Sequence, residues 1–287
     1  MLKQVICIKW GTRYGPEYAN RIYSMVARNV TPPFRVICFT DDRAGIRPEI
    51  DCYDLPDLGC PVPTSAPGKW RKTSLWGSTL FDITGVALFI DLDVVITGNI
   101  DDFFTCGSPD DVILARNWIR PLERLGQTSV FRYPVGKHGY LLERLRQDPE
   151  GVASEYQFEQ RYVTRCVRGG VKFFPRGTVK HFRLNCLGPW PLRYLRPARL
   201  PSSARMVLFP GKPDPHDAML GQWSSETGPV GPVEHVRSYF RGDRRMSFRK
   251  HFKRYLKPVG WIKEHWRDDA EPAAPAVDPA EPQSHAA

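Results

Sequence analysis

Residues 86–96 read VALFIDLDVVI, an apolar run into which two carboxylates, Asp91 and Asp93, are set. An unbroken apolar segment of this length is typical of a strand buried on both faces, where an unpartnered carboxylate is costly or takes up a proton. Residues i and i+2 of a strand point to one side, so we expect both carboxylates to project together near the strand's carboxyl end. Because like charges repel, the pair predicts a hard divalent cation, Mn²⁺ or Mg²⁺, with positions left open for a phosphorylated substrate.

The composition bounds the class of protein. The 287 residues give room for one large domain or two small ones, plus a tail. The first residues lack the order of a secretory signal, and no apolar run approaches the roughly 20 residues that span a bilayer, so we expect a cytoplasmic chain. The seven cysteines are scattered and never spaced as C-x-x-C, which argues against a disulfide framework and a structural zinc site. The net charge of +10 invites a nucleic-acid interpretation, but its excess is heaviest from Arg237 onward.

Strands and helices alternate through the first half of the chain, which predicts an α/β fold with a mainly parallel central sheet flanked by helices. Residues 16–30 have helical spacing of apolar side chains, and the prolines in 31–33 stop that helix. A second helix is expected over residues 69–81, with Lys69 and Lys72 on one face. The expected strands cover residues 3–9, 34–40, 51–54 and 86–96.

Shorter elements are expected in the second half. Helical segments are predicted over residues 100–104, 137–147 and 155–167. The octet at 210–217 is too rich in proline for regular structure and should form a rigid loop. The expected strands cover residues 111–115, 129–131, 171–174, 179–182 and 206–209.

The C-terminal region changes character. Residues 237–269 are predicted as a basic, aromatic helical extension of a domain formed by residues 1–236, and residues 270–287, rich in Ala and Pro, as a disordered tail. The interleaved cations and aromatics of residues 237–267 fit stacking on nucleic acid. They equally fit a basic helix on an anionic membrane, where each cation contributes about 1 kcal/mol, or a merely solvated helix. We favour peripheral membrane contact over nucleic acid as the partner of this segment.

The acidic motif also suggests a family. Alone, Asp91-Leu92-Asp93 is a common pattern that also fits carboxylates capping a helix or binding arginine. Its position after a buried strand is where open α/β sheets bind ligands. With a Thr/Tyr loop after the first strand, a lysine-bearing helix and a late Gly-Lys-Pro sequence, it resembles the GT-A glycosyltransferases, especially glycosyltransferase family 8 and related bacterial cell-surface sugar transferases. The resemblance covers about residues 3–220. It implies a GT-A-like single domain whose Asp91 and Asp93 bind the metal.

The same resemblance implies a nucleotide-sugar site. Trp10, Thr12 and Tyr14 fall where such enzymes hold the nucleoside, although a turn packed by aromatics explains them equally well. Lys69 and Lys72 match the basic helix beside the sugar nucleotide, against the alternative of a solvated helical face.

A helix later in the chain supplies the predicted catalytic residues. Glu159-Gln160 lies where similar enzymes carry Asp-Gln beside the donor sugar. The resemblance therefore implies that Glu159 binds sugar hydroxyls and that Gln160 lies beneath the anomeric carbon. Without it, a Glu-Gln pair on a helix is usually a surface feature.

The late loop matches the family less well. Relatives often have a metal-binding histidine where Pro210 stands here, and proline has no side-chain ligand. His216 is then the nearest candidate for a third metal ligand and Asp214 the next, or two carboxylates, diphosphate and water hold the ion. Lys212 could still neutralise the diphosphate as a point charge. A polar loop residue is the competing interpretation of His216.

These features predict a metal-dependent glycosyltransferase that moves a sugar from a nucleoside-diphosphate sugar, expected to be a uridine one, to a cell-surface glycan or lipid-linked acceptor at the inner face of the membrane. A nucleotidyltransferase would also use paired carboxylates and a metal. It would be expected to carry a Gly-rich phosphate loop after its first strand, of which residues 10–15 are a poor version. A nucleic-acid-binding module without catalysis would rest on charge alone.

Overall fold

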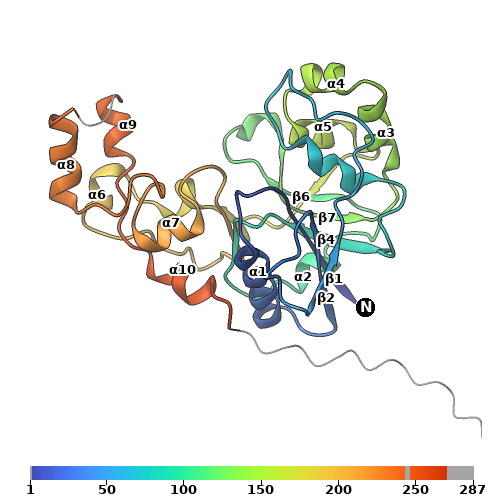
Figure 1. Ribbon diagram of the computed structural model, residues 1–287, viewed down its shortest axis with the longest axis horizontal. Helices are drawn as coiled ribbons and strands as arrows, with labels where there is room; N and C mark the ends of the chain where they lie inside the picture. The colour runs from blue at the N-terminus through green and yellow to red at the C-terminus, as the bar shows by residue number, and fades with distance from the viewer. Residues whose placement is uncertain (1, 243–245, 270–287) are drawn as a thin grey trace, which may run out of the picture.

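The computed structural model of the chain describes residues 2–242 and 246–269. Its central sheet has seven strands in the order β3 (Ile50–Tyr53), β2 (Phe34–Thr40), β1 (Lys3–Lys9), β4 (Val86–Ile90), β7 (Gly126–Pro134), β6 (Ile113–Arg116) and β8 (Lys172–Phe173) (Figure 1). Strands β1 to β4 pair in parallel, as do β6 and β8, whereas β7 runs antiparallel to β4 and β6. The expected α/β fold with a mainly parallel sheet is confirmed.

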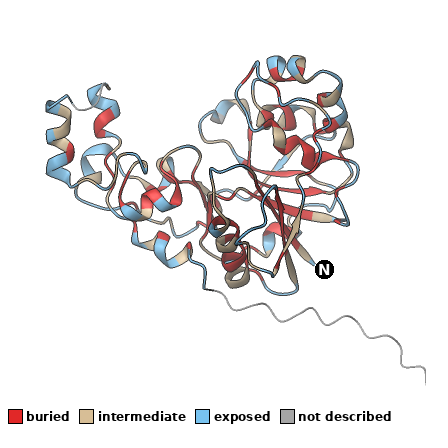
Figure 2. Ribbon diagram, viewed as in Figure 1, coloured by how far each residue is buried: buried red, intermediate tan, exposed pale blue. Residues whose placement is uncertain are grey.

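Alternate side chains of the central strands form two apolar layers. In β1, Val5 and Cys7 belong to the layer that contains α1 (Pro16–Asn29), whereas Ile6 and Ile8 belong to the opposite layer. Because both faces are covered, the middle parts of β1, β2 and β4 are apolar without interruption, and buried residues concentrate on the sheet (Figure 2). The second layer is completed by η1 (Trp70–Trp76), α3 (Gly139–Gln147), α4 (Pro149–Tyr156) and α5 (Glu159–Cys166).

The helix predicted from regular apolar spacing, α1, is confirmed. The predictions over residues 69–81 and 155–167 are wrong because each extends a helix past the residue where it ends. Helix α1 matches its prediction to within one residue at its end. The helix expected over residues 69–81 is a single 3₁₀ segment, η1, that stops at Trp76. The helix expected over residues 155–167 is two helices, because Gln157 has a left-handed backbone (φ 63°) and Phe158 is extended. The short helices α2 (Asp102–Thr105) and η2 (Pro121–Glu123) lie on either side of β6 in the sequence.

The acidic run is not one strand, which corrects the sequence prediction. Strand β4 ends at Ile90, and the chain turns through residues 91–93. The run then resumes as β5 (Val94–Ile96), which pairs with β10 (Met206–Leu208) in a separate sheet. Apolar character alone does not report this turn, because Leu92 within it is also buried. The second sheet is completed by β9 (Val179–His181), parallel to β10.

The proline-rich octet at 210–217 also contains regular structure that the sequence prediction missed. Helix α7 (Pro215–Leu220) begins inside it, with proline at its first position. Asp214 is the N-cap, and its side chain and that of Asp217 form a reciprocal capping box with the backbone of this first turn. Only residues 210–214 are therefore a loop.

The C-terminal helices form two groups. The short helix α6 (Trp190–Arg193), α8 (Pro232–Phe240) and α9 (Phe248–Phe252) gather at the end of the molecule away from α3, α4 and α5 (Figure 1). Helix α10 (Gly260–His265) instead returns to the main body, where Val259, Ile262 and Trp266 join the α1 layer. The Trp266 ring lies 5.1 Å from that of Tyr18, measured between centroids, and under the Arg21 guanidinium at 3.9 Å. Packing of this kind fixes the path of the chain beyond α9.

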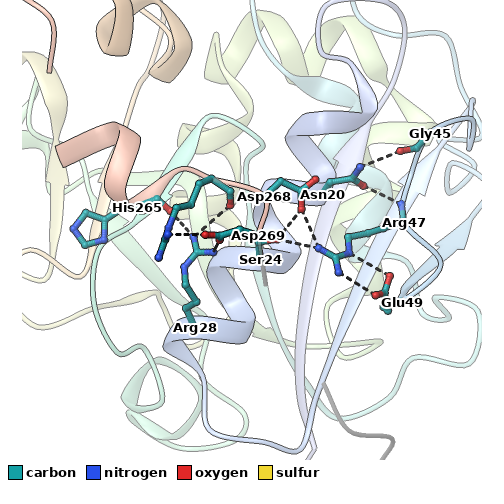
Figure 3. A network of polar contacts seen from close by, with 10 residues as sticks. Asn20, Ser24, Arg28, Gly45, Arg47, Glu49, His265, Asp268 and Asp269 are labelled. Atoms are coloured by element: carbon teal, nitrogen blue, oxygen red, sulfur yellow. Dashed lines mark hydrogen bonds and ion pairs between the residues drawn. The ribbon is translucent and has the colours of Figure 1, made fainter. Parts of the chain in front are cut away.

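Polar contacts fasten the last described residues to the first helix and to Arg47, which precedes β3 (Figure 3). Arg28 of α1 pairs with Asp269 at 2.6 Å and donates to the His265 carbonyl at 2.7 Å. Asp268 accepts hydrogen bonds from Ser24 at 2.8 Å and from Arg47 at 2.9 Å. We call these four pairings the C-terminal clasp, because they join residues far apart in the sequence.

None of the helices within residues 2–242 and 246–269 has the length and apolar character needed to cross a bilayer. The tail predicted to be disordered, residues 270–287, lies outside the described residues.

Candidate functional site

The turn after β4 brings two carboxylates to the carboxyl end of the parallel strands. The Asp91 N–H donates to the Ser129 carbonyl of β7 at 2.8 Å, and the Val94 N–H donates to the Asp91 carbonyl at 3.2 Å. Asp91 and Asp93 thereby border one cavity of about 110 Å³. They do so from a turn and not from alternate positions of a strand, so the predicted proximity arises from different geometry. The other side chains at this acidic cavity that bear on its chemistry are Trp10, Arg13, Tyr14, Lys69 and Lys72.

Lys72 holds Asp91. It lies on η1 with only 3% of its surface exposed, and its Nζ donates to both Asp91 carboxylate oxygens, at 2.8 and 3.0 Å. The same ammonium donates to the Thr128 carbonyl of β7 at 2.9 Å. The contacts satisfy all three N–H groups of a buried cation, so Lys72 is fixed beside the acidic pair rather than on a solvated face.

Asp93 is the less neutralised member of the pair. Its Oδ2 accepts a hydrogen bond from the Tyr14 hydroxyl at 3.2 Å. Burial, followed by the charge of Asp91, raises the pKa of Asp93 to about 7, against the opposing effects of Lys72 and Tyr14. Burial also raises the pKa of Tyr14 well above its usual range, which keeps its hydroxyl a donor. An added cation would relieve the unfavourable charge at Asp93.

The loop after β1 contributes Trp10, Arg13 and Tyr14 to the lining of the acidic cavity. Gly11 has a left-handed backbone (φ 63°), and its N–H donates to Asp41 at 2.9 Å, which holds the loop in place. The Lys69 ammonium lies 5.8 Å from the centre of the Trp10 ring. Thr12, predicted at the nucleoside, is exposed and does not line this cavity. Its neighbour Arg13 does, and the sequence prediction missed it although it stands in the same loop.

Glu159 lies behind the acidic cavity rather than on the surface. It begins α5 and is 2% exposed, and its Oε2 accepts a hydrogen bond from the Thr128 hydroxyl at 2.6 Å. Its Oε1 is buried and has no partner among the described residues. Burial raises the pKa of Glu159 to about 7, with Lys72 opposing and Asp91 adding to that effect. Thr128 therefore connects Glu159 to the ammonium that holds Asp91.

Gln160, the second predicted catalytic residue, is half-buried in the first turn of α5. Its carbonyl accepts from the Thr164 hydroxyl at 2.6 Å, and its side chain has no hydrogen bond within the described part of the chain. Neither Gln160 nor Glu159 lines the acidic cavity. Their predicted contacts with a donor sugar stay predictions.

The late loop approaches the acidic pair through Asp214. The negative charge of Asp214 contributes to the raised pKa of Asp93 and to that of Tyr14. One Asp214 oxygen, Oδ1, is buried without a hydrogen bond in the described structure, and Arg13 Nη2 lies 3.9 Å from it. Lys212 pairs with Asp214 at 2.9 Å and Asp217 at 3.1 Å. Lys212 lines a different cavity from the acidic pair, so its predicted contact with the diphosphate stays a prediction.

The donor set fits a hard divalent cation held by few protein ligands. Asp91 and Asp93 offer carboxylate oxygens at one cavity, which suits Mg²⁺ or Mn²⁺ completed by substrate phosphates and water. His216 is exposed on α7, with its ring 6.5 Å from that of Trp266. Across residues 2–242 and 246–269, no three His, Cys, Asp or Glu side chains come together in a way that could hold a metal ion. The predicted trio with His216 is therefore not assembled.

Comparisons with known proteins identify the fold. No protein-family profile matches the sequence, and no curated protein does. The solved structure of the glycosyltransferase GlyE of Streptococcus pneumoniae TIGR4 is 12% identical, with a TM-score of 0.53 over 87% of this chain and 63% of its own. The bifunctional glycosyltransferase WbbM is 11% identical, with a TM-score of 0.54 over 84% of this chain and 52% of its own. The chain thus spans less than two thirds of either structure and has the GT-A-like fold of these glycosyltransferases.

Proposed function

We propose that this chain is a glycosyltransferase that moves a sugar from a nucleoside-diphosphate sugar to a hydroxyl of an acceptor. The observation that carries the proposal is the pairing of Asp91 and Asp93 at one cavity, beside Lys72 and two aromatic side chains. The cavity lies where parallel β1 and β4 both end, the usual ligand position of open α/β sheets. The fold shared with GlyE and WbbM supports the same reaction class.

Asp91 and Asp93 would hold Mn²⁺ or Mg²⁺, which supplies positive charge to a departing nucleoside diphosphate. Lys72 holds the Asp91 carboxylate in one orientation through its two hydrogen bonds. Lys69 and Arg13 add positive charge at the mouth of the cavity, and the Trp10 and Tyr14 rings offer apolar faces to the nucleoside. The diphosphate would lie in this cavity of about 110 Å³, between the acidic pair and the cations that line it, and the nucleoside would lie outside it.

The remaining roles complete the proposal. Glu159 would bind donor sugar hydroxyls or, through Thr128 and Lys72, keep Asp91 in position. Gln160 would lie beside the anomeric carbon. The donor would be a uridine diphosphate sugar and the acceptor a cell-surface glycan or lipid-linked precursor, reached at the inner face of the membrane through residues 237–267.

A thermal-shift panel of nucleoside diphosphates and nucleoside triphosphates, each with and without Mn²⁺, tests the proposal. We expect one nucleotide, uridine diphosphate, to raise the melting temperature only when Mn²⁺ is present. The isosteric Asp93→Asn variant should lose this shift, whereas Asp54→Ala, which removes an exposed carboxylate from a surface ion pair, should keep it. The absence of a metal-dependent shift with any nucleotide would count against a sugar-nucleotide site. A shift with nucleoside triphosphates alone would favour a nucleotidyltransferase.

A further inference from the structure

A larger cavity, distinct from the acidic one, lies between the second sheet and α9. Its volume is about 580 Å³, roughly five times that of the acidic cavity at about 110 Å³. It is lined by cations from four parts of the chain and by no aspartate or glutamate. We call it the basic cavity, and its cations are Arg183, Arg193, Lys212, Lys250, Lys253 and Arg254.

The positive charge of the basic cavity is almost uncompensated. Of its cations, only Lys212 has a carboxylate partner among the described residues. Arg183 donates to the Pro210 carbonyl at 3.1 Å, and Arg193 donates to the Gly188 and Lys253 carbonyls, which are neutral acceptors. The side chains of Lys250, Lys253 and Arg254 make no hydrogen bond or ion pair within the described structure. Because like charges gathered in a concave wall repel and focus their field, this arrangement favours an anionic ligand.

The cavity wall also holds an unused hydrogen-bond donor. His181, at the end of β9, is 2% exposed, and its Nδ1 accepts from the Arg183 N–H at 3.2 Å. The ring proton is therefore on Nε2, which is buried and has no partner among the described residues. Burial and the neighbouring Arg183 lower the pKa of His181 to about 4, so the ring is neutral at physiological pH. The His181 ring packs edge-on against Trp118, with 5.7 Å between the ring centroids, so it forms part of the wall and adds no positive charge to the cavity.

The basic cavity is connected to the proposed donor site through one ion pair and shares a lining residue with a second cavity rich in cations. Lys212 lines it and pairs with Asp214, whose charge acts on Asp93. Leu184 lines both the basic cavity and a neighbouring cavity of about 460 Å³. That neighbour contributes three more cations and no acidic side chain; they are Arg116, Arg124 and Arg176.

We propose that the basic cavity binds a phosphate or diphosphate group of the acceptor, so that the transferase acts on a phosphorylated, anionic glycan. The inference rests on the proposed glycosyltransferase activity. Five cations without a carboxylate partner call for a multiply charged group, and a phosphate or diphosphate carries more charge and more acceptor oxygens than one carboxylate. Trp223, half-buried in the same wall, offers a ring face to the sugar attached to that group.

Calorimetric titration of the full chain with inorganic pyrophosphate tests the binding of the anion. Lys250 and Lys253 are exposed, so Lys250→Gln with Lys253→Gln should fold normally and bind pyrophosphate at least about tenfold more weakly, from the loss of two charge-assisted contacts. The matched control is Arg249→Gln with Lys263→Gln, which removes the same charge from exposed positions outside the cavity and should change the affinity less than about twofold. Equal weakening in both variants would overturn the proposal, because it would indicate general attraction to a basic surface.

Three further measurements separate the sources of the anion and the two proposals. Trp223→Ala should weaken binding of a sugar 1-phosphate more than binding of pyrophosphate; equal effects would contradict a glycan at this wall. If the Lys250→Gln, Lys253→Gln variant loses only binding to phosphatidylglycerol vesicles, or only binding to single-stranded RNA, a membrane or nucleic-acid surface replaces the proposal. If the Lys250→Gln, Lys253→Gln variant binds pyrophosphate as tightly as the natural chain, and Mn²⁺ with uridine diphosphate still raises the melting temperature, the acceptor inference fails and the proposed transferase activity stands. If the variant loses pyrophosphate binding but no nucleotide gives a Mn²⁺-dependent shift, the anion site stands and the transferase proposal fails.

Discussion

The acidic cavity and the basic cavity differ in how far their charged side chains are paired within the protein. Around the acidic cavity, Lys72 is 3% exposed and bonds Asp91 and the Thr128 carbonyl, so the main charges are matched within the protein. Around the basic cavity, exposed Lys250 and Lys253 have no carboxylate partner in the described residues. The side chains of the acidic cavity are held in place by contacts with the sheet, whereas the cations of the basic cavity are free to bind an anionic ligand.

This difference teaches that a charged group contributes to stability or to binding according to its partners. Breaking a buried ion pair by removing one partner is costly, because the other charge is then left without compensation. Exposed cations that repel one another stabilise nothing and are free to bind an anion. Substitutions in the two cavities should therefore affect different measurements.

The largest effect is expected from Lys72→Met. Removing the ammonium leaves Asp91, with 27% of its side chain exposed, without its cation beside Asp93 and leaves the Thr128 carbonyl unpaired. We expect a loss of about 3–4 kcal/mol in the free energy of unfolding, measured by urea denaturation. The matched Lys253→Met variant should change it by less than about 0.5 kcal/mol. Equal costs would erase the distinction between the two cavities.

Glu159→Gln should make stability less dependent on pH. Burial raises the pKa of Glu159 from 4.5 to about 7, so the folded chain retains a proton that the unfolded chain releases. Stability from this group is therefore present below pH 4.5 and is lost as the pH rises through 7, a change of up to about 3 kcal/mol. Because glutamine stays neutral, the variant should be more stable than the natural chain at pH 8 and similar to it at pH 4. Identical differences at both pH values would show that Glu159 is ionised when folded.

Asp93→Asn should separate the two binding sites. We expect Mn²⁺-supported binding of uridine diphosphate to weaken about a hundredfold, because a neutral amide replaces the less neutralised carboxylate of the pair. Pyrophosphate binding at the basic cavity should change less than about twofold, since Asp93 does not line it. Isothermal titration of both ligands on the same preparation measures this. A large loss of both would mean that the cavities act as one site.

The smallest effect is expected at the C-terminal clasp. Asp268→Ala removes contacts with Ser24 and Arg47 at the surface. The free energy of unfolding should fall by at most about 1 kcal/mol, seen as a small decrease in melting temperature. Hydrogen exchange should rise in α10 rather than in β4. Faster exchange in β4 would show that the clasp supports the acidic cavity as well.

Local patterns predicted the elements whose physical causes are local. The strands at 3–9 and 34–40 are confirmed to the residue, because apolar runs of that length next to a periodic helix have few alternatives. The turn at 91–93 was missed, because Leu92 continues the apolar pattern while the backbone leaves the sheet. The start of α7 was missed for the opposite reason: prolines that usually indicate a loop also open helices.

For the site, the sequence identified which residue types mattered near the acidic motif but not their geometry. Trp10, Tyr14 and Lys72 do meet the acidic pair, since loops after parallel strands reach the same edge of a sheet. The prediction named Thr12, two residues from both Trp10 and Tyr14, and missed the adjacent Arg13. Spacing along an irregular loop does not indicate which side chains line a cavity.

The sequence by itself determined the layered α/β fold and the presence of two carboxylates at the edge of its sheet. Apolar periodicity and the succession of strands and helices along the chain are local properties of the sequence. Only the tertiary structure decided which cation neutralises Asp91, that Glu159 is buried behind it, and that Arg183, Arg193 and Lys253 share one cavity. Those relations depend on residues brought together from distant parts of the chain, and electrostatic interactions follow distance and burial rather than sequence order.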